Sequence, residues 1–220
     1  GAVHSHLRIA SDTSSVMAAR IGNAEADLLL GCDLVASAAV DSFRTVDPAR
    51  TYVLGNSRIA PTASFTKDPN ASFDSSPLID QIRALVGDEH CDFVDATHLA
   101  SSLTGNSLAT NMFMVGVASQ KGLLPIGTEA INRAIELNGT AVSFNKLAYK
   151  LGRMAVHDPA VLEHLLAKQS TMPVETRKVR LEEIVADRSA RLERYQDKAY
   201  ARAYADFVSE VASREKSVVP

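Results

Sequence analysis

Apolar and polar residues recur along the first half of the chain at the spacings of both strands and helices. Alternation of apolar and polar side chains in the stretch VHSHLRI predicts a strand over residues 3–9. Short apolar or β-branched runs predict three further strands, over residues 26–30, 51–54 and 91–94. Between these runs the pattern predicts helices, one ending at Phe43 and two more over 77–86 and 97–103. Strands that alternate with helices in this way are typical of an α/β layer built on a parallel sheet.

The second half of the chain has the pattern of helices. Apolar residues at helical spacing predict helices over 107–120, 127–138 and 140–156, and Pro159 opens a further short one. Residues 176–216 differ in composition, with 10 Lys or Arg and 8 Asp or Glu among them. An apolar stripe from Leu181 to Phe207 predicts one long amphipathic helix there. We therefore expect a boundary near 170–176, between a domain of residues 1–170 and a charged helical extension of residues 171–220.

The predicted fold class is α/β, a Rossmann-like three-layer domain with a mostly parallel sheet, followed by a helical C-terminal extension. A doubly wound sheet normally has about five or six strands, whereas this pattern predicts three or four. The chain also begins with Gly1 rather than Met, and a strand pattern starts almost at once. We therefore expect a fragment whose missing strand or strands precede Gly1.

Composition and charge exclude several classes of protein. The 220 residues carry a net charge of −3, so the basic surface of a nucleic-acid-binding protein is missing. No apolar run approaches the roughly 18–20 residues that span a bilayer, and no signal peptide precedes the first predicted strand. Cys32 and Cys91 are too few for an iron–sulfur cluster, which needs about four thiolates. We expect a cytoplasmic protein that binds neither nucleic acid nor membrane and holds no metal.

Two candidate site residues follow predicted strands, at the end where open α/β sheets bind ligands. Asp33 comes after the strand at 26–30, where it either contributes to a ligand site or caps the following helix. Arg58 comes after the strand at 51–54, in the sequence Asn56-Ser57-Arg58 and just before Pro61-Thr62. It either meets an anionic group or is a solvated loop arginine.

Three further candidates lie at the start of the helix predicted over 107–120. Ser107 follows Thr104-Gly105-Asn106, and backbone N–H groups there either hold an anion or are capped by a side chain. Thr110 and Asn111 form a polar pair inside an apolar helix and need partners if they are buried. Asn111 is the best single polar candidate, with a satisfied structural amide as the alternative. No residue is predicted as a catalytic acid, base or nucleophile, because hydrolase and metal-binding spacings are missing.

Four stretches together resemble a known family. They are GAVHSHLRIA, AEADLLLGCDLV, DATHLASSLTGNSLATNMFMVGVASQKGLLP and AINRAIELNG. Residues 1–158 resemble the gamma domain of 2-oxoacid:ferredoxin oxidoreductases, and are most similar to the fused bacterial indolepyruvate ferredoxin oxidoreductases. The step Glu136-Leu137-Asn138-Gly139, followed by Ala141-Val142 and Asn145, is part of this resemblance. The stretch RLERYQDKAYARAY resembles the region that follows the gamma domain in the fused proteins.

The resemblance implies a coenzyme A-dependent oxidative decarboxylation of a 2-oxo acid, with thiamine diphosphate, iron–sulfur clusters and ferredoxin. The family's thiamine-binding pattern is missing, since Gly87-Asp88-Glu89 is not followed by paired Asn, and so is its N-terminal glycine-rich unit. The resemblance therefore implies an N-terminally truncated gamma-type domain that is inactive alone, dimerises, and positions other domains or subunits of the enzyme. Its expected cofactor-binding residues are Asn111, Thr110, Ser107, Asp33 and Arg58. The alternative is an independent binding or assembly module that docks a partner through its C-terminal helix.

Overall fold

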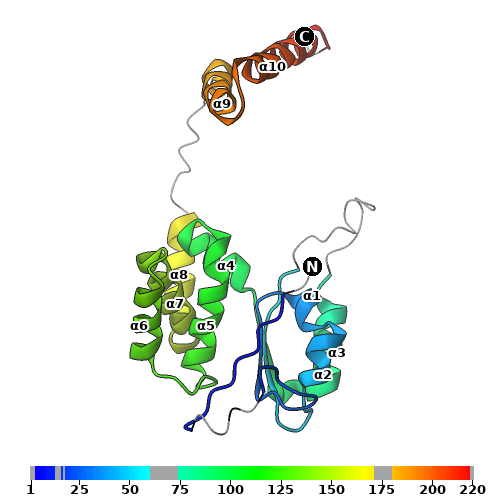
Figure 1. Cartoon of the computed structure of the whole chain (residues 1–220), viewed down its shortest axis with the longest axis vertical. Coiled ribbons are helices and arrows are strands. Elements are labelled where there is room, and N and C mark those ends of the chain that lie inside the picture. Colours follow the sequence, from blue (N-terminus) through cyan, green and yellow to red (C-terminus); the bar gives the residue numbers. More distant parts are fainter. Residues whose placement is uncertain (1–2, 13–15, 17, 60–73, 171–179, 219–220) are drawn as a thin grey trace. The chain divides into compact units, whose positions relative to one another are not determined.

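A computed structural model describes residues 3–12, 16, 18–59, 74–170 and 180–218. It divides the chain into two units, Gly1–Met172 and Pro173–Pro220, which we describe separately (Figure 1). The predicted loop residues Pro61 and Thr62, and most of the boundary predicted near 170–176, lie outside the described residues.

Three of the four predicted strands form one parallel sheet, which confirms the α/β fold class. They are β1 (Leu28–Gly31), β2 (Tyr52–Asn56) and β3 (Cys91–Val94), in the order β1-β2-β3. In register, Leu30 lies beside Leu54, and Gly55 beside Phe93. All three strands therefore end at the same edge of the sheet.

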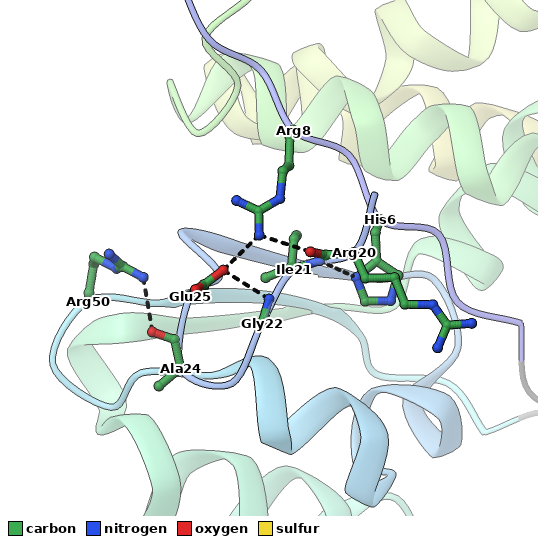
Figure 2. A network of polar contacts seen from close by, with 8 residues as sticks. All are labelled: His6, Arg8, Arg20, Ile21, Gly22, Ala24, Glu25 and Arg50. Atoms are coloured by element: carbon green, nitrogen blue, oxygen red, sulfur yellow. Dashed lines mark hydrogen bonds and ion pairs between the residues drawn. The ribbon is translucent and has the colours of Figure 1, made fainter. Parts of the chain in front are cut away.

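The strand predicted over residues 3–9 is wrong, because these residues pair with no strand. Its alternate apolar side chains cover no core, and Val3 and Leu7 are 85% and 78% exposed. Polar contacts hold the segment instead, as Figure 2 shows: Arg8 pairs with Glu25 at 2.7 Å, and the Ile21 N–H donates to Nδ1 of His6 at 3.2 Å. Alternation predicts a strand only where a neighbouring strand and a buried face are available.

Helices cover both faces of the sheet and give the three layers (Figure 1). Val53 and Leu54 point to opposite faces, as successive strand residues do. Val53 packs in a core with helices α1 to α3, whereas Leu54 packs in a second core with α4, α5, α7 and α8. On the first face lie α1 (Leu34–Ser37), α2 (Val40–Thr45) and α3 (Ser76–Val86). On the second side lie α4 (Ala96–Thr104), α5 (Thr110–Gln120), α7 (Val142–His157) and α8 (Pro159–Ser170). Helix α6 (Thr128–Asn138) packs against α5 and α7 in a separate apolar cluster.

Helices α5 and α7 approach each other backbone to backbone. Gly152 lies so near the carbonyl group of Phe113 that a Cβ atom there would come within 3.0 Å of it. Gly116 stands in the same relation to the Tyr149 carbonyl oxygen on the opposite helix. These two glycines let the helices pack at close range around the buried Phe113 and Ala148.

The described part of the second unit, residues 180–218, holds two helices where the sequence predicted one. They are α9 (Leu181–Tyr195) and α10 (Lys198–Val218), with Gln196 in a non-helical conformation between them. Asp197 accepts a hydrogen bond from the Tyr200 N–H at 2.8 Å, which is the bond of a helix N-cap. The apolar periodicity of the sequence continues through residues 196 and 197, so it does not predict the break between the two helices. Capping by a short polar side chain competes with helix continuation at this point.

Candidate functional site

The carboxyl edge of the sheet gathers polar residues from three separate parts of the chain. Asp33 follows β1, Asn56 ends β2, and Asp95 follows β3. Because the strands are parallel, these residues meet at one edge, where open α/β sheets bind their ligands. This edge is the candidate functional site.

Asn56 joins the three strand ends from a buried position, with only 3% of its surface exposed. Its Nδ2 group donates to the Cys32 carbonyl oxygen at 3.1 Å and to Oγ1 of Thr97 at 2.8 Å. Its Oδ1 atom lies 3.4 Å from the backbone nitrogen of Arg58, which donates to it. One side chain therefore sets the turn after β1, the loop after β2 and the first turn of α4 relative to one another.

The two aspartates at this edge act as helix caps. Asp33 Oδ1 accepts from the Ala36 N–H at 2.8 Å, and Asp95 Oδ1 accepts from the His98 N–H at 2.9 Å. The structure thus shows Asp33 in the helix-capping role, which was one of its two predicted roles. The other oxygen of Asp95, Oδ2, lies 3.8 Å from Nη1 of Arg58.

Arg58 provides an exposed positive charge at the site. Its side chain is 58% exposed, and its ion pair with Asp95 is long and solvated, which makes the pair worth about 0–1 kcal/mol. A guanidinium group has five N–H donors in a planar fork. Arg58 therefore keeps donors for an incoming phosphate or carboxylate, while its backbone is held by Asn56.

Cys32 lies next to this edge as a protonated thiol. Burial, followed by the nearby Asp33 charge, raises the pKa of the Cys32 thiol. Burial also raises the pKa of Cys91, with Asp88 and Asp92 adding to it and Arg83 opposing it. A thiol with a raised pKa is a poor nucleophile near neutral pH, because the thiolate is the reactive form.

The other three predicted residues lie at the far end of α4. Helix α4 has nine residues, which at about 1.5 Å per residue separates its ends by roughly 12 Å. Ser107 is exposed, and Asn106, not Ser107, caps the following turn by accepting from the Leu108 N–H at 2.9 Å. The five predicted residues therefore form two groups, at opposite ends of α4.

Thr110 and Asn111 differ in their surroundings. Thr110 is buried, and its hydroxyl donates to the Ser107 carbonyl oxygen at 2.7 Å, so it is satisfied locally. Asn111 is exposed, so the burial that would have forced it to find a partner is not present. The roles of all five residues as ligand contacts stay predictions.

Sequence reasoning missed the central position of Asn56. It named this residue only as a neighbour of Arg58, and it did not consider Thr97 or Asp95 as parts of the same edge. The available signal was a polar amide at the end of an otherwise apolar strand, since a buried amide needs partners. The partners themselves lie 24 and 41 residues away along the chain.

The described residues do not fit an iron–sulfur cluster or a resident metal ion. Among them, no group of three or more His, Cys, Asp or Glu side chains converges on one point. The whole sequence has two cysteines, below the roughly four thiolates that a cluster requires. Within the described parts of the chain, no helix has the length and apolar character needed to cross a membrane.

Comparison with known protein families gave two matches. Residues 1–155 match the model of the pyruvate ferredoxin/flavodoxin oxidoreductase family, and residues 181–219 match a family of unknown function. No curated protein and no solved structure matched the chain. The first match covers most of the α/β unit, including the sheet and the candidate site.

Proposed function

Because the chain belongs to the pyruvate ferredoxin/flavodoxin oxidoreductase family, we propose that it is part of an indolepyruvate ferredoxin oxidoreductase. Members of this family are oxidoreductases that act in multi-domain or multi-subunit assemblies with ferredoxin. In this proposal residues 1–170 belong to the gamma-type domain of that enzyme, and residues 171–220 belong to the region that follows it. The intact enzyme is a cytoplasmic homodimer in this proposal.

The motif resemblance supports the choice of indolepyruvate within the family. Part of that resemblance is Glu136-Leu137-Asn138-Gly139, which forms the corner between α6 and α7. Gly139 has a φ of 70°, the left-handed conformation that ends α6, and Asn145 Nδ2 donates to the Thr140 carbonyl oxygen at 2.9 Å. These contacts give the motif a structural role, so the preferred 2-oxo acid rests on the resemblance alone.

The proposed reaction is a coenzyme A-dependent oxidative decarboxylation of a 2-oxo acid. In the intact enzyme thiamine diphosphate supplies the decarboxylation chemistry, and iron–sulfur clusters carry the electrons to ferredoxin. Since the described residues do not fit a cluster, we assign those cofactors to other domains and derive no step through this chain. The role left for this domain is to position the catalytic domains and to bind part of a ligand.

Arg58 carries the ligand-binding part of the proposal. Its exposed guanidinium, at the carboxyl edge of the sheet, suits a phosphate group of coenzyme A. Asn56 holds the Arg58 backbone at 3.4 Å, and the long pair with Asp95 at 3.8 Å costs little to open. Asp33, Ser107, Thr110 and Asn111 remain secondary candidates.

The test uses the intact parent polypeptide, loaded with its thiamine diphosphate and clusters. Reduction of a low-potential dye is measured with coenzyme A and a panel of 2-oxo acids that includes indolepyruvate and pyruvate. We expect preference for an aryl 2-oxo acid, and no turnover by residues 1–220 alone. No reduction with any 2-oxo acid would overturn the proposal and favour the binding-module alternative.

Arg58→Ala tests the ligand contact in the same assay. Loss of a charged hydrogen bond of about 1.5 kcal/mol raises the KM for coenzyme A roughly tenfold with kcat unchanged. Arg133→Ala is the matched control, because Arg133 is similarly exposed at 66% and has one carboxylate partner, Glu136. Equal KM values in the two variants would remove Arg58 from the site.

One observation favours the alternative function. Tyr200, Phe207 and Val211 are exposed on α10 at intervals of seven and four residues, which places them on one face. An exposed apolar row of this kind is typical of a surface that binds another protein. Binding of a partner by a cofactor-loaded but inactive parent polypeptide, lost with Phe207→Ser, would support this reading.

A further inference from the structure

An apolar groove of about 420 Å³ runs beside β3 in the α/β unit. Its walls come from β3, α4, α5, the end of α7, and α8. Most of its surface is aliphatic, contributed by Val94, Leu99, Val117, Val156, Leu162 and Leu166. Its volume lies within the range of about 300–1,000 Å³ that is typical of ligand clefts.

The groove borders the backbone of β3, which is an edge strand of the described sheet. Asp92, Phe93 and Val94 all border it, although successive strand side chains point to opposite faces. Val94 packs in the core on the side of α4, α5 and α8, whereas the Phe93 side chain packs in the core on the other face, so Phe93 borders the groove with its backbone. The Val94 carbonyl oxygen accepts from the Ser57 N–H and so points toward β2. In a parallel strand the backbone groups of the alternate residue, Phe93, then point away from β2 and toward the groove.

The described sheet has fewer strands than is usual for a sheet covered by helices on both faces. Among the described residues it has three strands, with β3 at one edge, whereas sheets of four to six strands are the commonest. Helix α8 packs in the same core as α4 and α7 and walls the groove beside β3. No strand among the described residues pairs with β3 on that side, so the space there has a backbone edge on one side and apolar helix side chains on the other.

Two of the three charged residues that line the groove, Asp92 and Lys121, pair with each other, and the third is Glu163. Asp92 forms an ion pair with Lys121 and accepts a hydrogen bond from the Tyr52 hydroxyl. Burial works against ionisation of Asp92, but these bonds outweigh it and keep its pKa below the ordinary value. The apolar walls of the groove therefore favour an occupant with apolar side chains. The backbone groups at the edge of β3 favour an occupant with an extended backbone.

We propose that an extended segment from a neighbouring domain or subunit of the same oxidoreductase adds to β3 as a fourth strand. Its backbone pairs with the outward N–H and C=O of Phe93, and its alternate apolar side chains fill the groove against Leu99, Leu162 and Leu166. Unpaired sheet edges bind extended segments in this manner, with main-chain hydrogen bonds for affinity and side-chain pockets for specificity. The origin of the segment rests on the proposed function.

Amide hydrogen exchange tests the proposal, with residues 1–220 alone compared with the assembled parent enzyme. The Phe93 amide exchanges fast in the chain alone and slows by roughly two orders of magnitude in the assembly. The Val94 amide, on the β2 side, is the internal control and stays slow in both. Equal rates for Phe93 in the two samples, fast or slow, would overturn the proposal, and a small molecule in the groove would leave the Phe93 amide fast.

A pair of variants tests the groove itself. Leu166→Arg places a charge in the groove and abolishes the protection of Phe93 in the assembly, whereas Val161→Arg, on the same helix outside the groove, leaves it. Protection that survives Leu166→Arg would overturn the role of the groove. Thermal melting of both variants checks that they fold. Dye reduction by the same enzyme is measured separately. An active enzyme whose Phe93 amide exchanges fast would refute this inference but not the proposed function. An inactive enzyme whose Phe93 amide is protected would refute the proposed function but not this inference.

Discussion

Replacement of Asn56 by alanine removes the side chain that joins the three strand ends at the candidate site. Its Nδ2 group makes hydrogen bonds at 3.1 and 2.8 Å, each worth about 1 kcal/mol net. The half-buried Cys32 carbonyl oxygen also loses its donor, which adds about 1 kcal/mol. We therefore expect Asn56→Ala to lower the free energy of unfolding by about 3 kcal/mol.

Thermal denaturation, followed by circular dichroism, measures this change. For a unit of this size each kcal/mol shifts the Tm by about 2–4 °C, so the expected fall is roughly 6–12 °C. Ser57→Ala is the control, because Ser57 bonds to Val94 through its backbone N–H, at 2.9 Å, which alanine keeps. The control should change the free energy by less than about 0.5 kcal/mol. A Tm for Asn56→Ala within about 2 °C of the control would refute the argument that Asn56 holds this edge together.

Two further predictions concern packing and pH. Gly152→Ala forces a Cβ atom against the Phe113 carbonyl group and should lower the free energy of unfolding by about 3 kcal/mol, measured with denaturant. Gly127→Ala is the control and should be nearly neutral, because a Cβ there meets nothing within 4 Å. Equal denaturation midpoints for the two variants would contradict the close packing of α5 and α7. Burial, with the hydrogen bond to Asp92, raises the pKa of Tyr52 to about 12, so its contribution to stability is fully present below pH 10 and is lost as pH rises through about 12. The ultraviolet titration difference between wild type and Tyr52→Phe should therefore have its midpoint near pH 12, and a midpoint near 10 would show that Tyr52 lies in water.

Local patterns were sufficient for elements that bury their own apolar face. The strands at 26–30, 51–54 and 91–94 were predicted because short apolar or β-branched runs stand between turn residues, and each lies in the sheet within two residues. The strand over 3–9 failed because its alternation meets no neighbouring strand. The single C-terminal helix failed because apolar spacing does not register a cap such as Asp197.

For the candidate site, the sequence determined which residue types follow each strand, because the spacing of apolar residues predicts the order of strand, turn and helix. Asp33 and Arg58 were identified in this way, and the family resemblance agreed with the match over residues 1–155. Only the tertiary structure decided that Asn56 is the residue that bonds to both Cys32 and Thr97, and that Ser107, Thr110 and Asn111 lie at the other end of α4. The physical reason is that hydrogen bonds between residues 24 and 41 positions apart exist only once three parallel strands have aligned their ends.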